Sequence, residues 1–226
     1  SIEISGIDCH IGSQLLDPAP MTEAAEKILG LVDQLGREGI KLDHIDLGGG
    51  LGIRYRDETP LPVAGYAAML RALFAGRREK LLIEPGRWLV AEAGVLLTRV
   101  EYLKPGPAKH FAIVDAAMND LLRPALYDAW HGVDPVRPRA GRAERWEIVG
   151  PVCESADFLA RERDLDLAPG DLLAVRAAGA YAMAMSSNYN ARPRAAEVMV
   201  DGERAHLVRR RETVPDLYAA EATLPR

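Results

Sequence analysis

Apolar residues in the first 94 positions follow two periods, one typical of short strands and one of amphipathic helices. Strands are predicted over 2–7, 44–47 and 81–83. Helices are predicted over 22–38 and 63–77, from apolar residues at helical spacing: Ala25, Ile28, Leu31, Val32 and Leu35, then Tyr66, Met69, Leu70, Leu73 and Phe74. Thr22 is expected to cap the first helix and Gly39 to end it. This alternation favours a parallel α/β arrangement, in which functional residues gather at the carboxyl ends of the strands.

The pattern changes after about residue 94 and becomes mainly β. Strands are predicted over 95–103, 111–115, 145–149, 171–176, 197–200 and 205–209. Asp201-Gly202 predicts a hairpin turn between the last two. We therefore expect two domains: an α/β domain over 1–94 and a mainly-β domain over 95–226.

Composition narrows the function without identifying it. The 226 residues include 28 basic and 33 acidic ones, for a formal charge of -5, which gives no footprint for nucleic acid or an anionic membrane. Arg209, Arg210 and Arg211 form a short basic run that is expected to be a solvated strand end. Cys9 and Cys153 show no metal-ligand spacing, so no metal site is expected, and their small number favours the cytoplasm. No apolar stretch approaches the length of a membrane span.

The three strands of the first domain end in residues that could bind a phosphorylated cofactor. His10 and Ser13 follow the first strand, Gly48, Gly49 and Gly50 the second, and Glu84-Pro85-Gly86-Arg87 the third. Successive glycines let backbone N–H groups approach a phosphate, although a tight turn explains them equally well. Glu84 could pair with a cationic ring nitrogen, and an ion pair with Arg87 or a helix cap is the plainer alternative.

The second half carries three further motifs. In RPALYDAWH (123–131), Arg123 could bind a carboxylate with Tyr127 nearby, or the segment could be a surface loop with an exposed arginine. GPVCESADFL (150–159) places Cys153 and Glu154 on a turn, where a structural cysteine is unusual. SSNYN (186–190) is too polar for a plain core segment and predicts a buried hydrogen-bonded junction.

Taken together and in order, these motifs resemble the diaminopimelate decarboxylases. The resemblance rests on HIGSQ, DLGGGLGI, EPGR, RPALYDAWH, GPVCESADFLA and AYAMAMSSNYNARPRAAEVMVDG, and it covers essentially the whole chain. That family belongs to the alanine-racemase-like group of pyridoxal-phosphate decarboxylases, with the ornithine and arginine decarboxylases as relatives. It implies that residues 1–94 are the last part of a cofactor-binding (β/α)8 barrel. It also implies the last step of lysine biosynthesis, meso-2,6-diaminopimelate to L-lysine and CO2.

The resemblance also implies a role for each motif residue. His10 would stack on the pyridine ring, and Glu84 would face the ring nitrogen. Ser13, Gly48, Gly49, Gly50, Gly86, Arg87 and Tyr181 would hold the cofactor phosphate. Arg87, Arg123, Tyr127 and Tyr181 would bind substrate. Cys153, as proton donor, and Glu154, which recognises the distal end of the substrate, would reach into the active site of the other subunit of a homodimer.

The sequence departs from this family in one respect. The lysine that holds the cofactor covalently lies on the first strand of the family's barrel, and none of Lys27, Lys41, Lys80, Lys104 and Lys109 occurs in that motif. The chain is therefore expected to be a C-terminal fragment that is inactive alone. Two alternatives stay open: a related decarboxylase of ornithine, arginine or carboxynorspermidine, and a non-catalytic homologue that binds a partner.

Overall fold

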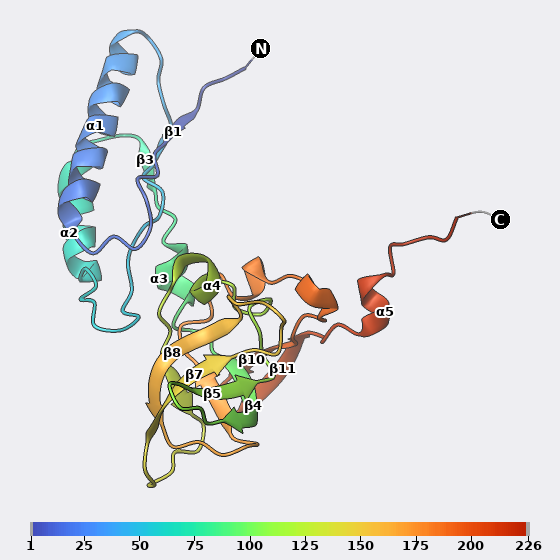
Figure 1. The fold of residues 1–226 in the computed structure, drawn as a ribbon. Coiled ribbons are helices and arrows are strands. Elements are labelled where there is room, and N and C mark those ends of the chain that lie inside the picture. The colour runs from blue at the N-terminus through green and yellow to red at the C-terminus, as the bar shows by residue number, and fades with distance from the viewer. Residues whose placement is uncertain (1, 225–226) are drawn as a thin grey trace. The chain divides into compact units, whose positions relative to one another are not determined.

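The computed structural model describes residues 2–224 of a chain that divides into two compact units, Ser1–Glu92 and Ala93–Arg226 (Figure 1). The first unit is α/β and the second is mainly β, as the sequence predicted. Each unit has its own buried apolar residues, so each is described by itself.

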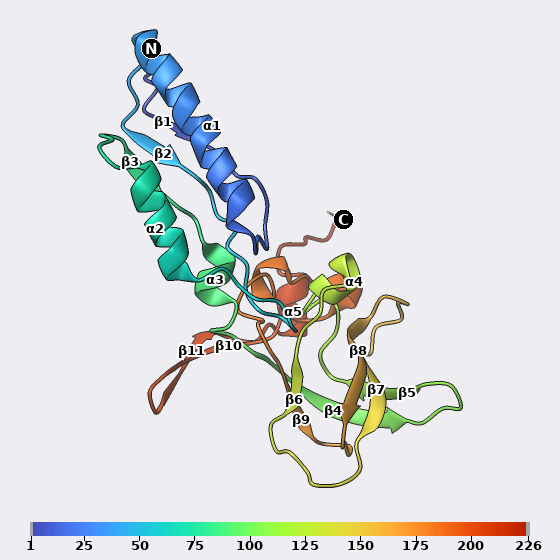
Figure 2. The ribbon, with the colours of Figure 1, turned by 90° about the vertical axis from the view of Figure 1, so that its left-hand side faces the viewer.

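Three parallel strands form the sheet of the first unit, in the order β1 (Gly6–Asp8), β2 (His44–Asp46) and β3 (Lys80–Leu82). The connections contain α1 (Pro18–Arg37) and α2 (Val63–Leu73), which lie side by side along the sheet (Figures 1 and 2). Buried residues on their inner faces, such as Val32 and Leu70, pack with Ile45 and Leu51. The predicted parallel α/β arrangement is confirmed.

The start of α1 corrects one prediction. Asp17 caps this helix, because its extended backbone lets Oδ1 accept the Ala19 N–H at 2.9 Å, and Pro18 occupies the first helical position. Thr22 lies inside the helix, where its hydroxyl donates to the Pro18 carbonyl at 3.0 Å. Gly39 does follow the helix end, with φ +89°. The second helix stops at Leu73, before the predicted residue 77.

Six strands form the main sheet of the second unit, in the order β6-β9-β4-β5-β7-β8. They are β4 (Leu96–Lys104), β5 (His110–Val114), β6 (Val133–Pro135), β7 (Glu144–Val149), β8 (Phe158–Leu165) and β9 (Leu172–Val175). The end strands β6 and β8 also contact each other, so the sheet is nearly closed. Trp146, Ile148, Leu159 and Leu173 are among the buried residues of its core.

The remaining elements are short. The first unit ends with α3 (Gly86–Val90). The second unit also contains α4 (Arg123–Tyr127), η1 (Met183–Met185), η2 (Tyr189–Ala191), β10 (Glu197–Asp201), β11 (Arg204–Arg209) and α5 (Val214–Leu217). The strands β10 and β11 pair antiparallel around Gly202, which has φ +58°, so the predicted hairpin is confirmed. β11 ends at Arg209, and this arginine and Arg210 form exposed ion pairs with Glu197 and Asp216.

Two strands were not predicted. β8 reads FLARERDL, in which charged residues hide the alternation of a strand. The structure shows how those charges are accommodated: the Arg161 guanidinium lies 3.6 Å from the centre of the Phe158 ring, and that of Arg163 lies 4.5 Å from the Trp130 ring. β6, with three residues, is too short for its period to be read.

Candidate functional site

The carboxyl ends of β1, β2 and β3 bring the first group of predicted residues together. Parallel strands end at the same edge of a sheet, so the segments after them become neighbours. The Gly49 N–H donates to His10 Nδ1 at 3.3 Å, which links the ends of β1 and β2. The Glu84 N–H donates to the Gly48 carbonyl at 2.8 Å, which links the ends of β2 and β3. His10, Gly48, Gly49 and Glu84 therefore lie at one edge.

The triglycine turn owes its composition first to close packing. A Cβ on Gly49 would lie 2.2 Å from the Glu84 carbonyl oxygen, and Gly48 and Gly50 have φ of +66° and +104°. The Gly48 N–H is already used, because it donates to Asp46 Oδ1 at 2.8 Å. Within residues 2–224, the Gly50 N–H donates to no protein acceptor. This N–H is the one the turn leaves available for a ligand.

Ser13 and Arg87 supply further groups suited to an anion. Arg87 Nη2 donates to Ser13 Oγ at 2.8 Å, and Nη1 donates to Tyr55 Oη at 2.5 Å. A Cβ on Gly50 would lie 2.7 Å from the Gly12 carbonyl, so the segment that carries Ser13 packs against the turn. Ser13 accepts from Arg87 and keeps its own hydroxyl hydrogen to donate. A hydroxyl, a backbone N–H and a guanidinium thus occur together, which is a donor set that suits phosphate.

Glu84 belongs to a cluster of three carboxylates. One oxygen each of Asp8, Asp46 and Glu84 lies within 4.8 Å of the others, and the Glu84 side chain is exposed. Pro85 is the N-cap of α3, so the alternative in which Glu84 caps that helix is wrong. Concentrated negative charge at an exposed edge favours a cationic group there, such as a protonated ring nitrogen.

The second unit holds Arg123 in an environment that sequence reasoning did not foresee. Arg123 begins α4 and is only 8% exposed, so the interpretation of an exposed surface arginine is wrong. Its Nη1 lies 3.0 Å from His131 Nε2, and its guanidinium lies 5.9 Å from the centre of the Tyr181 ring. Tyr127, at the end of the same helix, is exposed. The structure thus brings Arg123 and Tyr181 together.

Tyr181 has an unusual backbone conformation. Its φ is +63°, in the left-handed region that a bulky residue rarely adopts. Ala177, four residues earlier, is also left-handed, with φ +53°. Such conformations cost free energy and are concentrated at functional sites, where the surrounding structure maintains them. This observation supports a functional role for the segment around Tyr181.

The turn with the exposed thiol of Cys153 is tied down by a carboxylate that the sequence did not single out. Asp157 is 4% exposed; its Oδ1 accepts the Met118 N–H at 2.7 Å and its Oδ2 accepts the Val152 N–H at 2.6 Å. The Gly150 N–H donates to the Asp157 carbonyl at 3.1 Å. Cys153 and Glu154 lie between these anchored ends and face outward. In the sequence, the pair Gly150 and Asp157, seven residues apart, could have indicated this anchored turn.

Glu154 also has a partner outside its own turn. The Tyr189 hydroxyl donates to Glu154 Oε2 at 3.3 Å, and the Ala156 N–H donates to Oε1 at the same distance. Tyr189 itself belongs to the polar SSNYN segment. The position of the Glu154 carboxylate therefore depends on how that segment is held.

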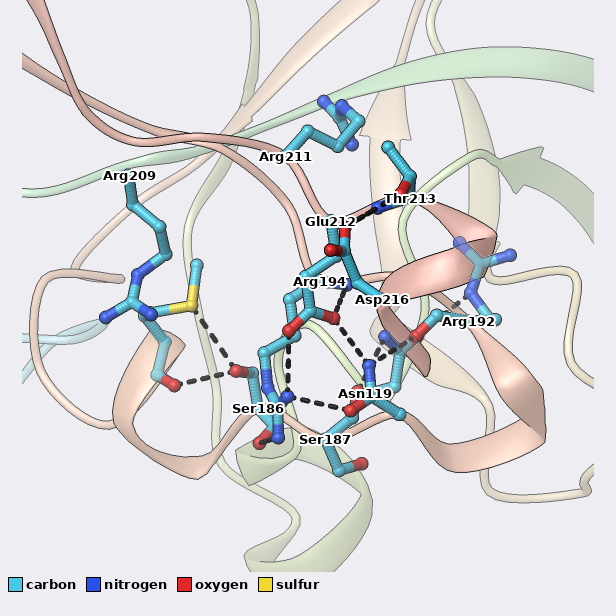
Figure 3. Close-up of polar contacts among 12 residues, drawn as sticks. Asn119, Ser186, Ser187, Arg192, Arg194, Arg209, Arg211, Glu212, Thr213 and Asp216 are labelled. Atoms are coloured by element: carbon cyan, nitrogen blue, oxygen red, sulfur yellow. Dashed lines mark hydrogen bonds and ion pairs between the residues drawn. The ribbon is translucent and has the colours of Figure 1, made fainter. Parts of the chain in front are cut away.

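Figure 3 shows the contacts that hold the segment. Asn119 Nδ2 donates to the Ser187 carbonyl at 3.3 Å, and Arg194 Nη1 donates to Asn188 Oδ1 at 2.7 Å and to Glu212 Oε1 at 3.1 Å. The pKa of Glu212 is lowered, first by the backbone N–H of Arg194 and then by the Asn188 side chain. The predicted hydrogen bonding of this junction is confirmed, but its predicted burial is wrong, because residues 186–188 are half-buried and Tyr189 and Asn190 are exposed.

Comparison with known proteins identifies the family. Residues 13–179 match the family described as pyridoxal-dependent decarboxylase, C-terminal sheet domain. The diaminopimelate decarboxylases of Pseudomonas aeruginosa and Vibrio cholerae are 63% and 56% identical over 99% and 100% of this chain. The chain spans about half of each relative, 54% of its length.

A solved structure agrees with these relatives. The diaminopimelate decarboxylase of Helicobacter pylori, complexed with L-lysine, has a TM-score of 0.91 and 40% identity, covering 97% of this chain and 55% of that one. None of the helices in the described residues is long and apolar enough to span a bilayer. The chain belongs to the pyridoxal-dependent decarboxylases that share this C-terminal sheet domain.

Proposed function

We propose that this chain is part of a decarboxylase that converts meso-2,6-diaminopimelate to L-lysine and CO2, in lysine biosynthesis. One observation carries the proposal: direct hydrogen bonds join three different strand ends at one sheet edge, from Gly49 to His10 and from Glu84 to Gly48. The names and identities of the relatives support the substrate. The first unit would be the last part of a (β/α)8 barrel, whose active sites lie at this end of the strands.

The residues at this edge fit pyridoxal 5'-phosphate. The Ser13 hydroxyl, the Gly50 N–H and the Arg87 guanidinium would bind the phosphate, with Gly48, Gly49, Gly86 and Tyr181 completing its surroundings. His10 accepts from Gly49 through Nδ1, which fixes its ring in one orientation for stacking on the pyridine ring. When bound, the cofactor supplies an aromatic ring that takes up the electron pair left by the departing carboxylate.

Glu84 would keep the pyridine nitrogen protonated. A nearby opposite charge favours the charged form of a titratable group, and here Asp8 and Asp46 add to the negative charge of Glu84. A protonated ring withdraws electrons more strongly. Glu84 therefore has a catalytic role in this proposal.

The substrate would be held by charged groups at both ends. Arg87, Arg123, Tyr127 and Tyr181 would bind its carboxylates, and Glu154 would bind the distal ammonium group. Burial of Arg123 strengthens any contact with a carboxylate, because water screens the charges less there. Diaminopimelate has a carboxylate and an amine at each end, which explains why a cation and an anion are both needed.

Cys153 would return a proton to the carbon that loses CO2. Its thiol is free and exposed, on a turn that Asp157 fixes at both ends. We propose that Cys153 and Glu154 act in the active site of a second copy, so that the enzyme is a homodimer. A thiol with this task must stay reduced, which favours the cytoplasm.

The lysine that holds the cofactor would come from a part of the parent protein that this chain does not include. Among the lysines of the first unit, Lys80 begins β3 and Lys41 precedes β2, at the opposite end of the strands from Glu84. Lys27 lies within α1 and pairs with Glu23 at 2.6 Å. None of these three is placed to reach the strand ends.

The experiment uses the complete gene product that contains this chain, with pyridoxal phosphate added. We expect CO2 release from meso-diaminopimelate, and an increase of at least about tenfold in the KM of Arg123→Ala, because a buried charged contact is lost. Arg142→Ala, which changes an exposed arginine of the same unit, serves as the control. Release of CO2 from ornithine, arginine or carboxynorspermidine in place of diaminopimelate would refute the substrate. Failure to bind the cofactor would favour the non-catalytic homologue.

A further inference from the structure

His131 is fully buried beside Arg123, and nothing in the proposed mechanism uses it. It follows α4 and precedes β6, and its side chain is 0% exposed. Its Nε2 lies 3.0 Å from Arg123 Nη1, and its Nδ1 lies 2.8 Å from the backbone carbonyl oxygen of Arg176. Both ring nitrogens are thus engaged by groups from other parts of the chain.

These two partners fix the protonation state of the ring. A guanidinium can only donate a hydrogen bond, so Nε2 must carry a lone pair. A carbonyl oxygen can only accept, so Nδ1 must carry the hydrogen. His131 is therefore a neutral imidazole with its hydrogen on Nδ1, because a second hydrogen on Nε2 would face the N–H of Arg123.

The ring is also held firmly in place. The His131 carbonyl accepts from Arg163 Nη2 at 3.0 Å, and the Arg163 guanidinium stacks on the neighbouring Trp130. The Arg176 N–H donates to the Gly132 carbonyl at 2.8 Å, which fastens the segment to the end of β9. An acceptor held this rigidly can orient a flexible arginine side chain.

The Arg123 guanidinium contacts the ring of His131, whereas Arg163 donates to the His131 backbone carbonyl and Arg176 contacts the ring through its own backbone carbonyl. Arg123 belongs to α4, Arg163 to β8, and Arg176 follows β9 with its side chain paired to Asp134 of β6. The Arg123 guanidinium next to the ring disfavours an imidazolium there. The surroundings therefore agree with the hydrogen-bond geometry on a neutral ring.

We propose that His131 is a positioning residue that orients the Arg123 guanidinium toward the substrate carboxylate. By accepting one N–H of Arg123, the ring limits the rotation of the planar guanidinium. Two-point binding of a carboxylate needs such a fixed plane. This inference rests on the proposed function only for the identity of the group that Arg123 binds.

The first test needs no substrate. In the complete gene product labelled with ¹⁵N-histidine, NMR correlations of ring nitrogens with ring protons distinguish the two neutral tautomers. We expect the His131 signal, assigned by its loss in His131→Gln, to show hydrogen on Nδ1 at neutral pH. A hydrogen on Nε2, or an imidazolium, would overturn the inference even if the enzyme decarboxylates diaminopimelate.

The second test compares two amide side chains that replace opposite halves of the ring. His131→Asn retains a donor near the Nδ1 position and loses the acceptor for Arg123, so the KM for diaminopimelate should rise about tenfold while kcat changes less. His131→Gln places an amide oxygen near the Nε2 position and should restore most of the affinity. An equal rise in KM for both variants would indicate a purely structural role and refute the positioning role. An unchanged KM in a folded, active His131→Asn enzyme would refute it as well.

Discussion

The turn that carries Cys153 and Glu154 is expected to open when Asp157 is replaced by alanine. The buried carboxylate accepts two backbone N–H groups, those of Met118 at 2.7 Å and Val152 at 2.6 Å. A hydrogen bond to a charged group contributes about 1.5–3 kcal/mol, so the two together contribute about 3–6 kcal/mol. Removal of a buried charge returns part of this, because the charge no longer has to be desolvated. We therefore expect a net loss of about 3 kcal/mol in the stability of the turn.

Hydrogen exchange of backbone amides measures this loss where it occurs. Local opening controls the exchange of protected amides, and 1.4 kcal/mol corresponds to a factor of ten. In the complete gene product, Asp157→Ala should make the Met118 and Val152 amides exchange roughly a hundredfold faster. Asp157→Asn should not restore them both, because its NH2 group would face one of the two N–H donors.

Asp166→Ala is the matched control. Asp166 also accepts a backbone N–H, that of Gly141 at 2.9 Å, but this hydrogen bond is exposed to solvent. Its loss should affect the Gly141 amide and leave Met118 and Val152 unchanged. If Met118 and Val152 kept their protection in Asp157→Ala, the carboxylate would not hold the turn and our explanation of its geometry would be refuted.

Two further predictions concern the triglycine turn and the junction of Figure 3. Gly49→Ala should lower the free energy of unfolding by about 2–3 kcal/mol in calorimetry, because its Cβ would lie 2.2 Å from the Glu84 carbonyl oxygen. Gly86→Ala should change this free energy little, since beyond the adjoining backbone no atom lies within 4 Å of the added Cβ. Equal effects of the two substitutions would contradict the packing argument. The pKa of Glu212 is lower in the folded state than its usual 4.5, so its stabilising contribution is present above pH 4.5 and is lost as the pH falls toward the folded-state pKa. Glu212→Gln should therefore flatten the dependence of stability on pH below 4.5 in acid titrations of thermal unfolding, and an unaltered dependence would exclude this carboxylate as a source of acid sensitivity.

Local features of the sequence determined the elements of the first unit and the edge at which its site lies. Apolar residues that recur every three to four positions indicate the helices α1 and α2, and short apolar runs indicate the strands β1, β2 and β3. Parallel strands must end at one edge, so placing His10, Gly49 and Glu84 after three such strands was enough to predict that they meet. The N-cap of α1 is also a local feature of the sequence, the pair Asp17-Pro18, although the sequence analysis predicted Thr22 as the cap.

Only the tertiary structure decided how the side chains of the second unit are held. Arg123 is buried because His131 accepts its N–H, and His131 is fixed by the carbonyl of Arg176, which lies 45 residues further along the chain. Asp157 and Met118 are likewise 39 residues apart. Periodicity describes neighbours within about two helical turns, whereas the partner of a buried polar group is selected by the packing of distant strands. For that reason the motifs were visible in the sequence, and the residues that hold them in place were not.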